Sequence, residues 1–595
     1  MWYLEQAVSF FRTTCLLSLA LLGACATQSS TITKLVDGRQ IATRSVDPDA
    51  YEHAIRALLF EEQERWQDAV AELQRALAFD GDSPELHARL AELFLRLDKI
   101  KDAAAEAKES LKLGASSSGF LASAHVHRIQ GDLPGEVAAL RKAAAQVDFD
   151  ASDDEAESVH LELAEAELRS LDLAAARTTL ETLCEAQPAS GTGRMRLTAI
   201  AWAVGDMAKA EAHLHAALSE EPNQIEALTA LAWIHAATGK NDDARRVFHE
   251  ALDRSEGALE IGAAFTRFLV GIGSTKDAEQ VADDLAVPDS SLDADSLAAR
   301  VELERSARRF ARGLALLSRG AEMGIAETPK TKIALLRAGL LKDLDRNDDA
   351  LTVLLNVNKS SPLFLEARLR AAELLRESGK GDQAIRILDE AAKLAQGEPS
   401  TIAVETAVAA ALVEEKRGNP AAGIARLEKV LANHPDEIRA VMILAAIQDR
   451  SGQWKEALAL AEKLLAKNPG SVDALNFWGF IAADHDYSLD LALRRLQVAS
   501  ALDPGSGGLL DSVGWVHFRR HDLDKAAVFL EQAARLEPVD PEIQWHLGTL
   551  YAQRKETERA TSAFRRSLSF HPDERLRHKV EESLARLVDR KASNP

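Results

Sequence analysis

The chain has 595 residues, more than one compact core holds, so it contains either several domains or an open-ended repeat array. Aromatic residues make up only 5% of it and charged residues 28%, which suits helices with one apolar stripe and a solvated opposite face. The formal net charge of −22 argues against a nucleic-acid-binding protein, because binding phosphate needs concentrated Lys and Arg. An acidic surface can attract basic partner segments, although a solvated helical surface is the simpler interpretation.

The first element is the N-terminal segment, residues 1–24, in which a single basic residue, Arg12, precedes a short apolar core. Its apolar core is shorter than the roughly 20 residues of a transmembrane helix, so we predict a signal peptide. The segment ends in Leu22-Gly23-Ala24-Cys25, which resembles the bacterial lipobox. That resemblance implies that the Cys25 sulfur carries a diacylglycerol and that Cys25 is the first mature residue. A plain secretory peptide with a coincidental cysteine is the alternative.

The residue after the cysteine bears on the destination. Ala26 stands where an aspartate commonly retains such lipoproteins at the inner membrane, so the lipobox resemblance implies the outer membrane, facing the periplasm. Several acyl chains on one cysteine anchor a protein far better than a single chain does. Residues 25–49 are then the lipid anchor and, because they are polar and lack a helical period, a flexible tether.

A repeat period organises the rest of the chain, and we align it on the pattern small-x-x-x-large-x-x-small, as in Ala210-Leu214-Ala217. The first small position recurs fifteen times, and eight of the fourteen intervals are 34 residues. The intervals of 40, 37 and 39 residues mark insertions, which a solenoid accommodates in loops or in a longer helix. The recurring positions are 69, 103, 136, 176, 210, 244, 278, 313, 350, 384, 423, 457, 492, 526 and 560.

Proline gives a second mark, twelve residues after the small position, in eight of the units, for example Pro188 and Pro538. A proline there ends the second helix of a hairpin, since it lacks the N–H donor and clashes with the preceding turn. The pattern resembles the tetratricopeptide repeat over residues 50–574. That resemblance implies an all-α fold, a right-handed α-solenoid of about 15 helical hairpins.

The chain ends in an amphipathic segment, residues 575–595. Leu576, Val580, Leu584 and Leu587 fall on one helical stripe among basic residues. We therefore predict a C-terminal capping helix that covers the apolar face of the last hairpin, as solenoids require.

No catalytic or ligand-binding spacing rises above chance in this sequence. It contains no Walker loop, His-Glu-x-x-His, Gly-x-Ser-x-Gly or Cys-x-x-Cys motif. The pairs His125/His127 and His213/His215 do not indicate a metal site, because residues two apart point to different faces of a helix. We therefore expect a protein that is not an enzyme and has no metal, cofactor or small-molecule substrate.

Aromatic residues on the first helices suggest where a partner binds. In the family, positions near 2, 5, 9 and 12 of each first helix line the concave groove, and large rings there are candidate anchors. The alternative is that the rings only pack between neighbouring hairpins. The expected anchors are Trp202, Trp233, Phe480, Trp515 and Trp545, and the expected polar contacts beside the late cluster are Asp473, Asn476, Asp511 and Arg519.

The motifs Asp511-Ser512-Val513-Gly514-Trp515-Val516 and Pro541-Glu542-Ile543, with the anchor and the repeat number, resemble one group of tetratricopeptide lipoproteins. These are the binding partners of the periplasmic carboxyl-terminal processing protease. The resemblance implies an adaptor that binds and activates that protease and delivers peptidoglycan hydrolases for degradation. A second hypothesis is an assembly component of an outer-membrane polysaccharide export or pilus machine.

Overall fold

The computed structural model describes residues 31–36, 39–44, 47–147, 149, 153–286, 292–293, 296–328, 332–394, 400–570 and 572–593. The predicted signal peptide and Cys25 lie outside these residues. The chain divides into two compact units, residues 1–126 and residues 127–595, and each is described by itself. None of the described helices is both long enough and apolar enough to cross a membrane.

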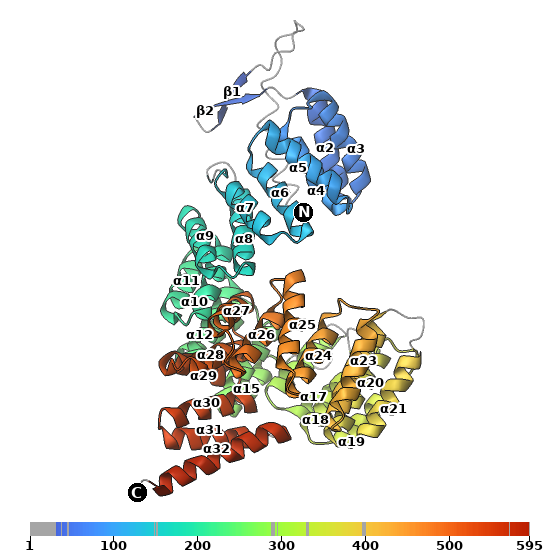
Figure 1. Ribbon diagram of the computed structural model, residues 1–595, viewed down its shortest axis with the longest axis vertical. Helices are drawn as coiled ribbons and strands as arrows, with labels where there is room; N and C mark the ends of the chain where they lie inside the picture. The colour runs from blue at the N-terminus through green and yellow to red at the C-terminus, as the bar shows by residue number, and fades with distance from the viewer. Residues whose placement is uncertain are drawn as a thin grey trace. The chain divides into compact units, whose positions relative to one another are not determined.

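The first unit contains a β-hairpin followed by helical pairs (Figure 1). Strands β1 (Thr31–Val36) and β2 (Arg39–Arg44) are antiparallel, with Thr31 opposite Arg44. The sequence analysis did not predict this hairpin, which falls within the segment expected to be a tether. The helices of this unit are α2 (Pro48–Glu62), α3 (Trp66–Phe79), α4 (Pro84–Arg96), α5 (Ile100–Leu113) and most of α6 (Ser117–Gln130).

The second unit continues the succession of paired helices. Its first half contains α7 (Leu133–Ala144), α8 (Asp153–Arg169), α9 (Leu173–Ala186), α10 (Gly191–Ala203), α11 (Met207–Glu220), α12 (Ile225–Ala237), α13 (Asn241–Arg254), α14 (Leu259–Gly271), α15 (Thr275–Asp284), α16 (Leu297–Ser306), α17 (Phe310–Glu322) and α18 (Ile333–Asp343).

The second half of that unit contains α19 (Asn347–Leu355), α20 (Phe364–Glu377), α21 (Gly381–Leu394), α22 (Ser400–Lys416), α23 (Pro420–Leu431), α24 (Ile438–Arg450), α25 (Trp454–Lys467), α26 (Val472–Asp484), α27 (Leu489–Leu502), α28 (Gly507–Arg519), α29 (Leu523–Leu536), α30 (Pro541–Gln553), α31 (Thr557–Ser569) and α32 (Glu574–Ser593). In the described part of the chain, α2 to α31 are thirty successive helices, two for each of the fifteen units that the sequence period predicts.

The recurring small position explains how the helices of a pair approach each other. Twelve of the fifteen positions hold alanine, and each of these side chains is fully buried in the second helix of its pair. Gly423 departs from alanine for a visible reason: a Cβ there would stand 2.8 Å from the carbonyl oxygen of Ala411 in α22. The α22 and α23 backbones are therefore closer than alanine allows.

A residue with positive φ lies between the two helices of every pair, five or six residues before the small position. Glycine supplies it in seven pairs, as at Gly205, and residues such as Glu64 and His521 supply it in the others. This left-handed residue ends the first helix and turns the chain into the second. Its recurrence gives all fifteen turns the same local geometry.

The C-terminal helix α32 closes the end of the array. Val580 and Leu587 are buried, and Leu576 and Leu584 pack against the same hydrophobic core. The helix contacts both α30 and α31. It therefore covers the face that the last hairpin would otherwise expose.

The second unit also makes contacts between repeats that are far apart in the sequence. Helix α27 packs against α9 and α10, and α29 packs against α12 and α14 (Figure 1). Buried residues of these early and late helices belong to one hydrophobic cluster. We call this contact between α9–α14 and α27–α29 the closure seam.

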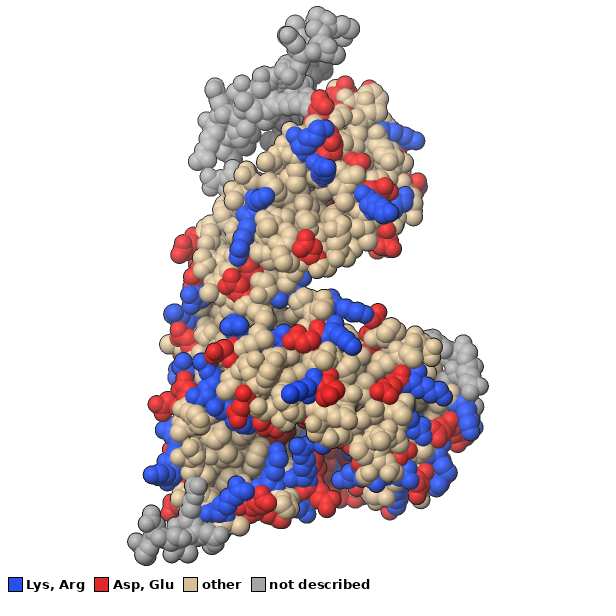
Figure 2. All heavy atoms as spheres, viewed as in Figure 1, with Lys and Arg blue, Asp and Glu red and all other residues tan. Residues whose placement is uncertain are grey.

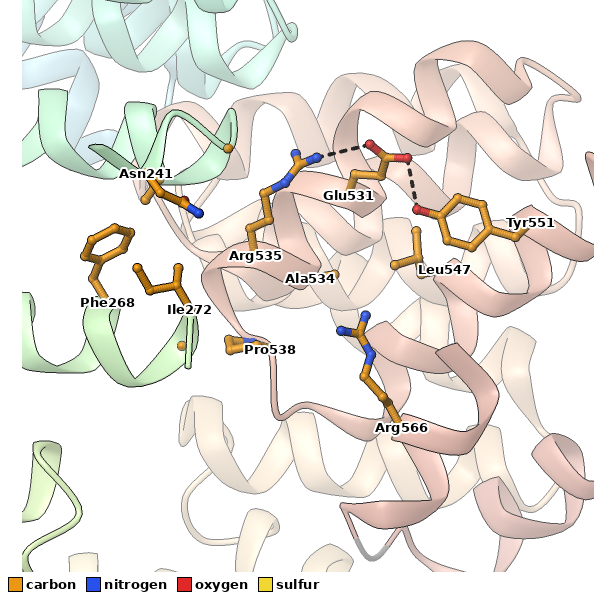
Figure 3. Close-up of a pocket in the computed structure, with 13 residues that line it drawn as sticks. Asn241, Phe268, Ile272, Glu531, Ala534, Arg535, Pro538, Leu547, Tyr551 and Arg566 are labelled. Atoms are coloured by element: carbon orange, nitrogen blue, oxygen red, sulfur yellow. Dashed lines mark hydrogen bonds and ion pairs between the residues drawn. The ribbon is translucent and has the colours of Figure 1, made fainter. Parts of the chain in front are cut away.

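Polar groups of the late helices are bonded at the closure seam, and Figure 3 shows Glu531 bonded to both Arg535 and Tyr551. The Arg535 guanidinium donates to the carbonyl oxygen of Ala237 at 2.9 Å and to Glu531 at 3.3 Å. Glu531 also accepts a hydrogen bond from the Tyr551 hydroxyl at 2.9 Å. These contacts border a recess of about 300 Å³ between α12–α14 and α29–α31.

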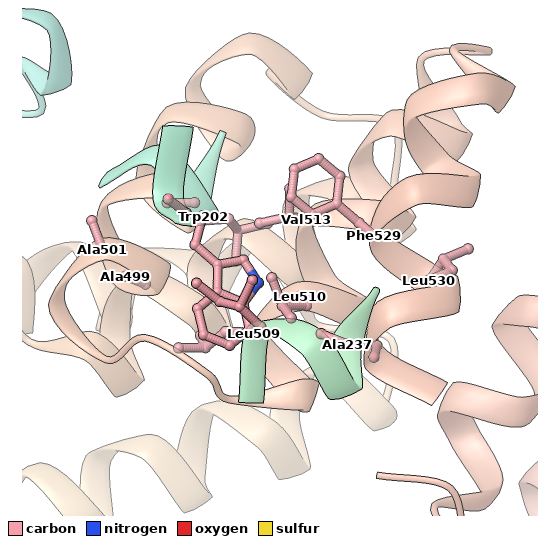
Figure 4. Close-up of a cluster of buried hydrophobic side chains, with 14 of the residues drawn as sticks. Trp202, Ala237, Ala499, Ala501, Leu509, Leu510, Val513, Phe529 and Leu530 are labelled. Carbon is pink, nitrogen blue, oxygen red and sulfur yellow. The ribbon is translucent and has the colours of Figure 1, made fainter. Parts of the chain in front are cut away.

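The apolar part of the closure seam surrounds the indole of Trp202 (Figure 4). Only 4% of Trp202 is exposed, among Leu509, Leu510 and other residues of the buried cluster. Its Nε1–H donates to Gln532 Oε1 at 3.0 Å, so both the ring and its polar group are satisfied inside the protein. Trp202 is thus a seam residue, which corrects the prediction that it lines an open groove.

Candidate functional site

Two adjoining recesses lie along the first helices of the late repeats, and we call them together the late groove. The larger, of about 630 Å³, is lined by residues of α24, α26, α28 and α30, and the smaller, of about 330 Å³, by residues of α24, α26, α30 and α32. Both include Phe477, Phe480 and Glu542. The late groove therefore extends across four successive repeats and the capping helix.

Helical periodicity places the lining residues of α26 on one face. Asp473, Asn476, Phe477 and Phe480 are spaced three, one and three residues apart, and all four line the larger recess. Residues three and four apart lie on the same side of a helix. The buried residues Leu475 and Trp478 occupy the opposite face, which packs into the core.

The predicted ring cluster is present, and a histidine lies at its centre. The His546 ring is 4.2 Å from the Trp515 ring and 4.9 Å from the Trp545 ring, measured between centroids. Phe480 lies 6.0 Å from the same imidazole. Trp515 is only 4% exposed and forms the base of the cluster, whereas Phe480 and Trp545 are half-buried and line the groove.

Asp511 and His546 form a buried hydrogen-bonded pair beneath the late groove. The His546 Nδ1–H donates to Asp511 Oδ2 at 2.7 Å. Burial alone would lower the pKa of His546, but the Asp511 carboxylate outweighs that effect and raises it. Asp511 Oδ1 is also buried, and among the described residues it has no hydrogen-bond partner.

Glu542 stands at the junction of the two recesses. The residue keeps contact with solvent, yet the protein packed around its carboxyl raises its pKa. The charge of His546 opposes this shift, and the carboxylates of Asp511 and Asp540 reinforce it. The late groove therefore concentrates negative charge at this point.

The structure places three of the four predicted polar residues in the larger recess: Asp473, Asn476 and Asp511. Arg519 is not among the residues that line either recess. Its guanidinium donates to the Asp484 carbonyl oxygen at 2.8 Å and pairs with Asp486. Arg519 thus ties α28 to the end of α26, a structural role that the sequence did not predict.

Trp233 in α12 is placed apart from the late ring cluster. Its half-buried ring meets Phe248 edge-on at 5.3 Å and packs against the hydrophobic core. Phe248 is among the largest fully buried side chains. Trp233 therefore packs against α13, the second helix of its own hairpin.

Sequence reasoning missed three residues of the site: His546, Phe477 and Glu542. Asp511 and His546 are 35 residues apart, close to one repeat, so they occupy nearly equivalent positions in adjacent units. A search for complementary polar residues one period apart could have found this pair. Phe477 and Glu542 gave no comparable signal, because apolar and acidic residues are frequent on such helices.

Comparison with protein families decides the nature of these repeats. Models described as "Tetratricopeptide repeat" match residues 56–119, 201–253, 416–477 and 514–575. The chain contains tetratricopeptide repeats in these four segments. The two later matches contain α24, α25 and the first part of α26, and the end of α28 with α29 to α31, so they include the α24 and α30 residues of the late groove but none of its α28 residues.

A TPR repeat-containing protein of Pseudomonas aeruginosa is 27% identical to this chain over 185 residues. The match covers 31% of this chain and 30% of the relative, so it spans under a third of the relative's own length.

Solved structures with related folds include Cut9–Hcn1, a hetero-tetramer of the APC/C, at 15% identity and a TM-score of 0.36. That match covers 91% of this chain and 97% of the other. A tetratricopeptide repeat protein from Parabacteroides merdae has 15% identity and a TM-score of 0.33, over 43% of this chain and 98% of that protein.

The chemistry of the late groove suits binding. Tetratricopeptide-repeat scaffolds are generally non-catalytic, and their repeats generally mediate contacts between proteins. Within the described ranges, no group of three or more His, Cys, Asp or Glu side chains is arranged to hold a metal ion. What the late groove offers a ligand is aromatic surface, carboxylates and a fixed helical frame.

Proposed function

We propose that this protein is a lipid-anchored periplasmic scaffold that holds a partner protein in the late groove. The observation that carries the proposal is the half-buried state of Phe477 and Phe480 on α26 and of Trp545 on α30, which line the groove. Aromatic side chains in preformed recesses are typical anchors of protein interfaces. Stacked helical hairpins hold them in place without a large rearrangement on binding.

The anchor rests on the lipobox-like sequence that ends in Cys25. A lipid on that residue would hold the repeats near a membrane and raise their effective concentration for partners in the same compartment. We propose the periplasmic face of the outer membrane, because Ala26 follows the cysteine. In a Cys25→Ala variant, palmitate labelling and membrane retention should both be lost, and a variant that remained labelled would contradict the anchor.

For the partner, we propose the periplasmic carboxyl-terminal processing protease, with peptidoglycan hydrolases as the proteins delivered to it. Support comes from the resemblance of the blocks around Trp515 and Glu542 to lipoproteins that bind this protease. The scaffold would bring protease and substrate together and supply no catalytic group itself.

Affinity capture from a crosslinked cell envelope tests this function. The full-length protein should recover a serine protease and peptidoglycan hydrolases, and Phe480→Ala and Trp545→Ala should each reduce recovery about tenfold or more, as expected for interface anchors. Phe79→Ala is the matched control, because that ring is 49% exposed but lies on α3, in the first unit. It should leave recovery unchanged.

Two outcomes would contradict the proposal in different ways. Recovery of export or pilus subunits alone would replace the protease partner with the second hypothesis from the sequence. Equal recovery by the wild type, Phe480→Ala and Trp545→Ala would show that partners bind elsewhere on the chain.

A further inference from the structure

The larger recess of the late groove carries an excess of negative charge. The charged groups lining it include four carboxylates and a single guanidinium, that of Arg439, which is already paired with Glu405. Figure 2 shows, by contrast, a face on which Lys and Arg are interspersed with Asp and Glu. The four carboxylates belong to Asp473, Asp511, Asp540 and Glu542.

Part of this charge is engaged within the protein. Asp540 caps α30 and accepts hydrogen bonds from the N–H groups of Glu542 and Ile543 at 2.8 and 3.0 Å. Asp511 Oδ2 accepts from His546, but Asp511 Oδ1 is left without a donor among the described residues. Only 5% of Asp511 is exposed, and the residue lines the recess. A ligand bound there can supply the missing hydrogen-bond donor.

Glu542 adds to the negative charge of the recess. Desolvation raises the pKa of its carboxyl, the charges of Asp511 and Asp540 reinforce that shift, and the charges of His546 and Lys579 oppose it. An adjacent cation would reverse this shift, because opposite charge favours the ionised carboxylate. The recess is thus electrostatically complementary to a positively charged group.

The apolar lining narrows the choice of cation. Phe477, Phe480, Met442 and Ile443 line the same recess as the carboxylates. A guanidinium is planar, is more weakly hydrated than an ammonium, and can stack on an aromatic ring while donating two hydrogen bonds to a carboxylate. Arginine therefore suits a recess with an aromatic wall and an acidic wall better than lysine does.

Helix α27 contains an example of a guanidinium that meets both an aromatic ring and a carboxylate. The Arg495 guanidinium in α27 lies 4.0 Å from the centre of the Trp478 ring. Its two Nη atoms donate to the two carboxylate oxygens of Glu462 at 2.9 and 3.0 Å. One guanidinium thus meets an aromatic face and a carboxylate together within this repeat geometry.

We propose that the larger recess binds an extended peptide segment of the partner through one arginine, whose guanidinium meets Asp511 and Glu542, and through an adjacent apolar side chain, which meets Phe477 and Phe480. This inference rests on the proposed scaffold function and specifies the chemistry of the bound segment. The smaller recess continues the groove past Trp545, so there is room for the residues that follow.

A peptide-display selection on the full-length protein in detergent, with random twelve-residue peptides as probes, tests the inference. The selected peptides should be enriched in arginine next to an apolar residue. Glu542→Gln should weaken a selected peptide about tenfold at roughly 0.15 M salt, since it removes a charge-assisted contact. Replacing the peptide's arginine with lysine should weaken it several-fold.

Two control variants locate the binding. Glu558→Gln removes an exposed carboxylate on α31 and should not change affinity, which excludes a general effect of net charge. Phe480→Ala should abolish binding of the selected peptides, which places them in the late groove. Binding that survives Phe480→Ala would contradict the proposal.

The inference is overturned if the selection yields no binders or binders without arginine, if lysine peptides bind equally well, or if Glu542→Gln binds as tightly as the wild type. The scaffold proposal fails separately. If envelope capture still depends on Phe480 while the peptides show no preference for arginine, the scaffold stands and only the arginine inference is lost.

Discussion

The closure seam and the late groove use the same kind of residue in opposite surroundings. Trp202 on α10 is covered by the late helices and is 4% exposed, whereas Phe480 on α26 and Trp545 on α30 remain half-buried beside recesses. All three occupy groove positions of first helices. A ring at such a position is therefore available to a partner only where no distant repeat packs over it.

The polar groups of the two regions differ less than the rings do. At the closure seam, Trp202 Nε1 is bonded to Gln532, and the Arg535 guanidinium is bonded to a carbonyl oxygen of α12. Buried polar atoms without a partner among the described residues occur both on the seam helices, at His235 Nδ1 and His517 Nδ1, and at the late groove, at Asp511 Oδ1 and Trp545 Nε1. What distinguishes the late groove is that Asp511 also lines a recess.

The largest expected effect is on stability at the seam. Trp202→Ala should destabilise the protein by about 3–5 kcal/mol, because it removes a fully packed aromatic ring. Hydrogen exchange should then accelerate both in α9–α10 and in α27–α29. Trp202→Phe, which loses the hydrogen bond to Gln532 but keeps most of the packing, should cost much less. Faster exchange in α10 alone would show that the two sets of helices do not stabilise each other.

The two regions should respond to pH with opposite signs. Burial lowers the pKa of His517 to about 4, and its ring stacks on Phe529, which lies against Gly205 at the seam. Between these pKa values the unfolded state binds a proton at His517 that the folded state does not bind. The stability that the neutral His517 contributes should therefore be lost as the pH falls from about 6.5 to 4. His546, with its raised pKa, should contribute most below pH 6.5 and lose that contribution as the pH rises through its folded pKa.

Urea unfolding of wild type, His517→Gln and His546→Gln as a function of pH measures these contributions. The difference between wild type and His517→Gln should shrink toward acid pH, and the difference between wild type and His546→Gln should shrink toward alkaline pH. The same sign for both variants would refute the assignment of a neutral His517 and a charge-stabilised His546.

A smaller effect on stability is expected from glycine substitutions, which distinguish packing at the seam from backbone strain. Gly205 has φ of +81°, and a Cβ there would stand 3.0 Å from the Phe529 ring, while Gly452 has φ of +84° and open space around it. Gly452→Ala should cost about 1 kcal/mol from the left-handed backbone alone, and Gly205→Ala about 1–3 kcal/mol more from overpacking. Equal losses of stability for the two variants in thermal unfolding would mean that the seam accommodates the added methyl group without overpacking.

The smallest expected stability effect is at the late groove. Trp545→Ala should cost only about 1 kcal/mol, because the ring is half-buried and a recess lies beside it. Circular dichroism during thermal unfolding should show a nearly unchanged transition. A loss as large as that of Trp202→Ala would assign Trp545 to the core.

The local fold could be predicted from the sequence because the residues that determine each helical hairpin lie within a single repeat. Buried alanines such as Ala210 mark twelve of the fifteen hairpins, and prolines such as Pro538 mark eight, through the demands of close packing and chain termination, so the number of repeats followed from their spacing. Position 423 holds glycine instead of alanine. The structure shows that it serves the same packing at a shorter distance.

The closure seam could not be predicted, because Trp202 and Gln532 are 330 residues apart. Whether they meet depends on small rotations that accumulate over the intervening repeats, and no local pattern encodes their sum. The late groove was predicted in part, since Phe480, Trp515 and Trp545 mark it by their size. Arg519 lies beside the cluster, 5.9 Å from the centre of the Trp515 ring, but it does not line either recess, and its guanidinium is bonded to the end of α26.

Site-specific photocrosslinking tests the central claim most directly. A benzoylphenylalanine placed at Phe480 probes the late groove, and one placed at Ile272 probes the seam recess beside Pro538. In intact envelopes, the probe at Phe480 should crosslink to another protein, and the probe at Ile272 should crosslink within the chain, to the segment joining α29 and α30. Partner adducts from Ile272 with none from Phe480 would contradict the account.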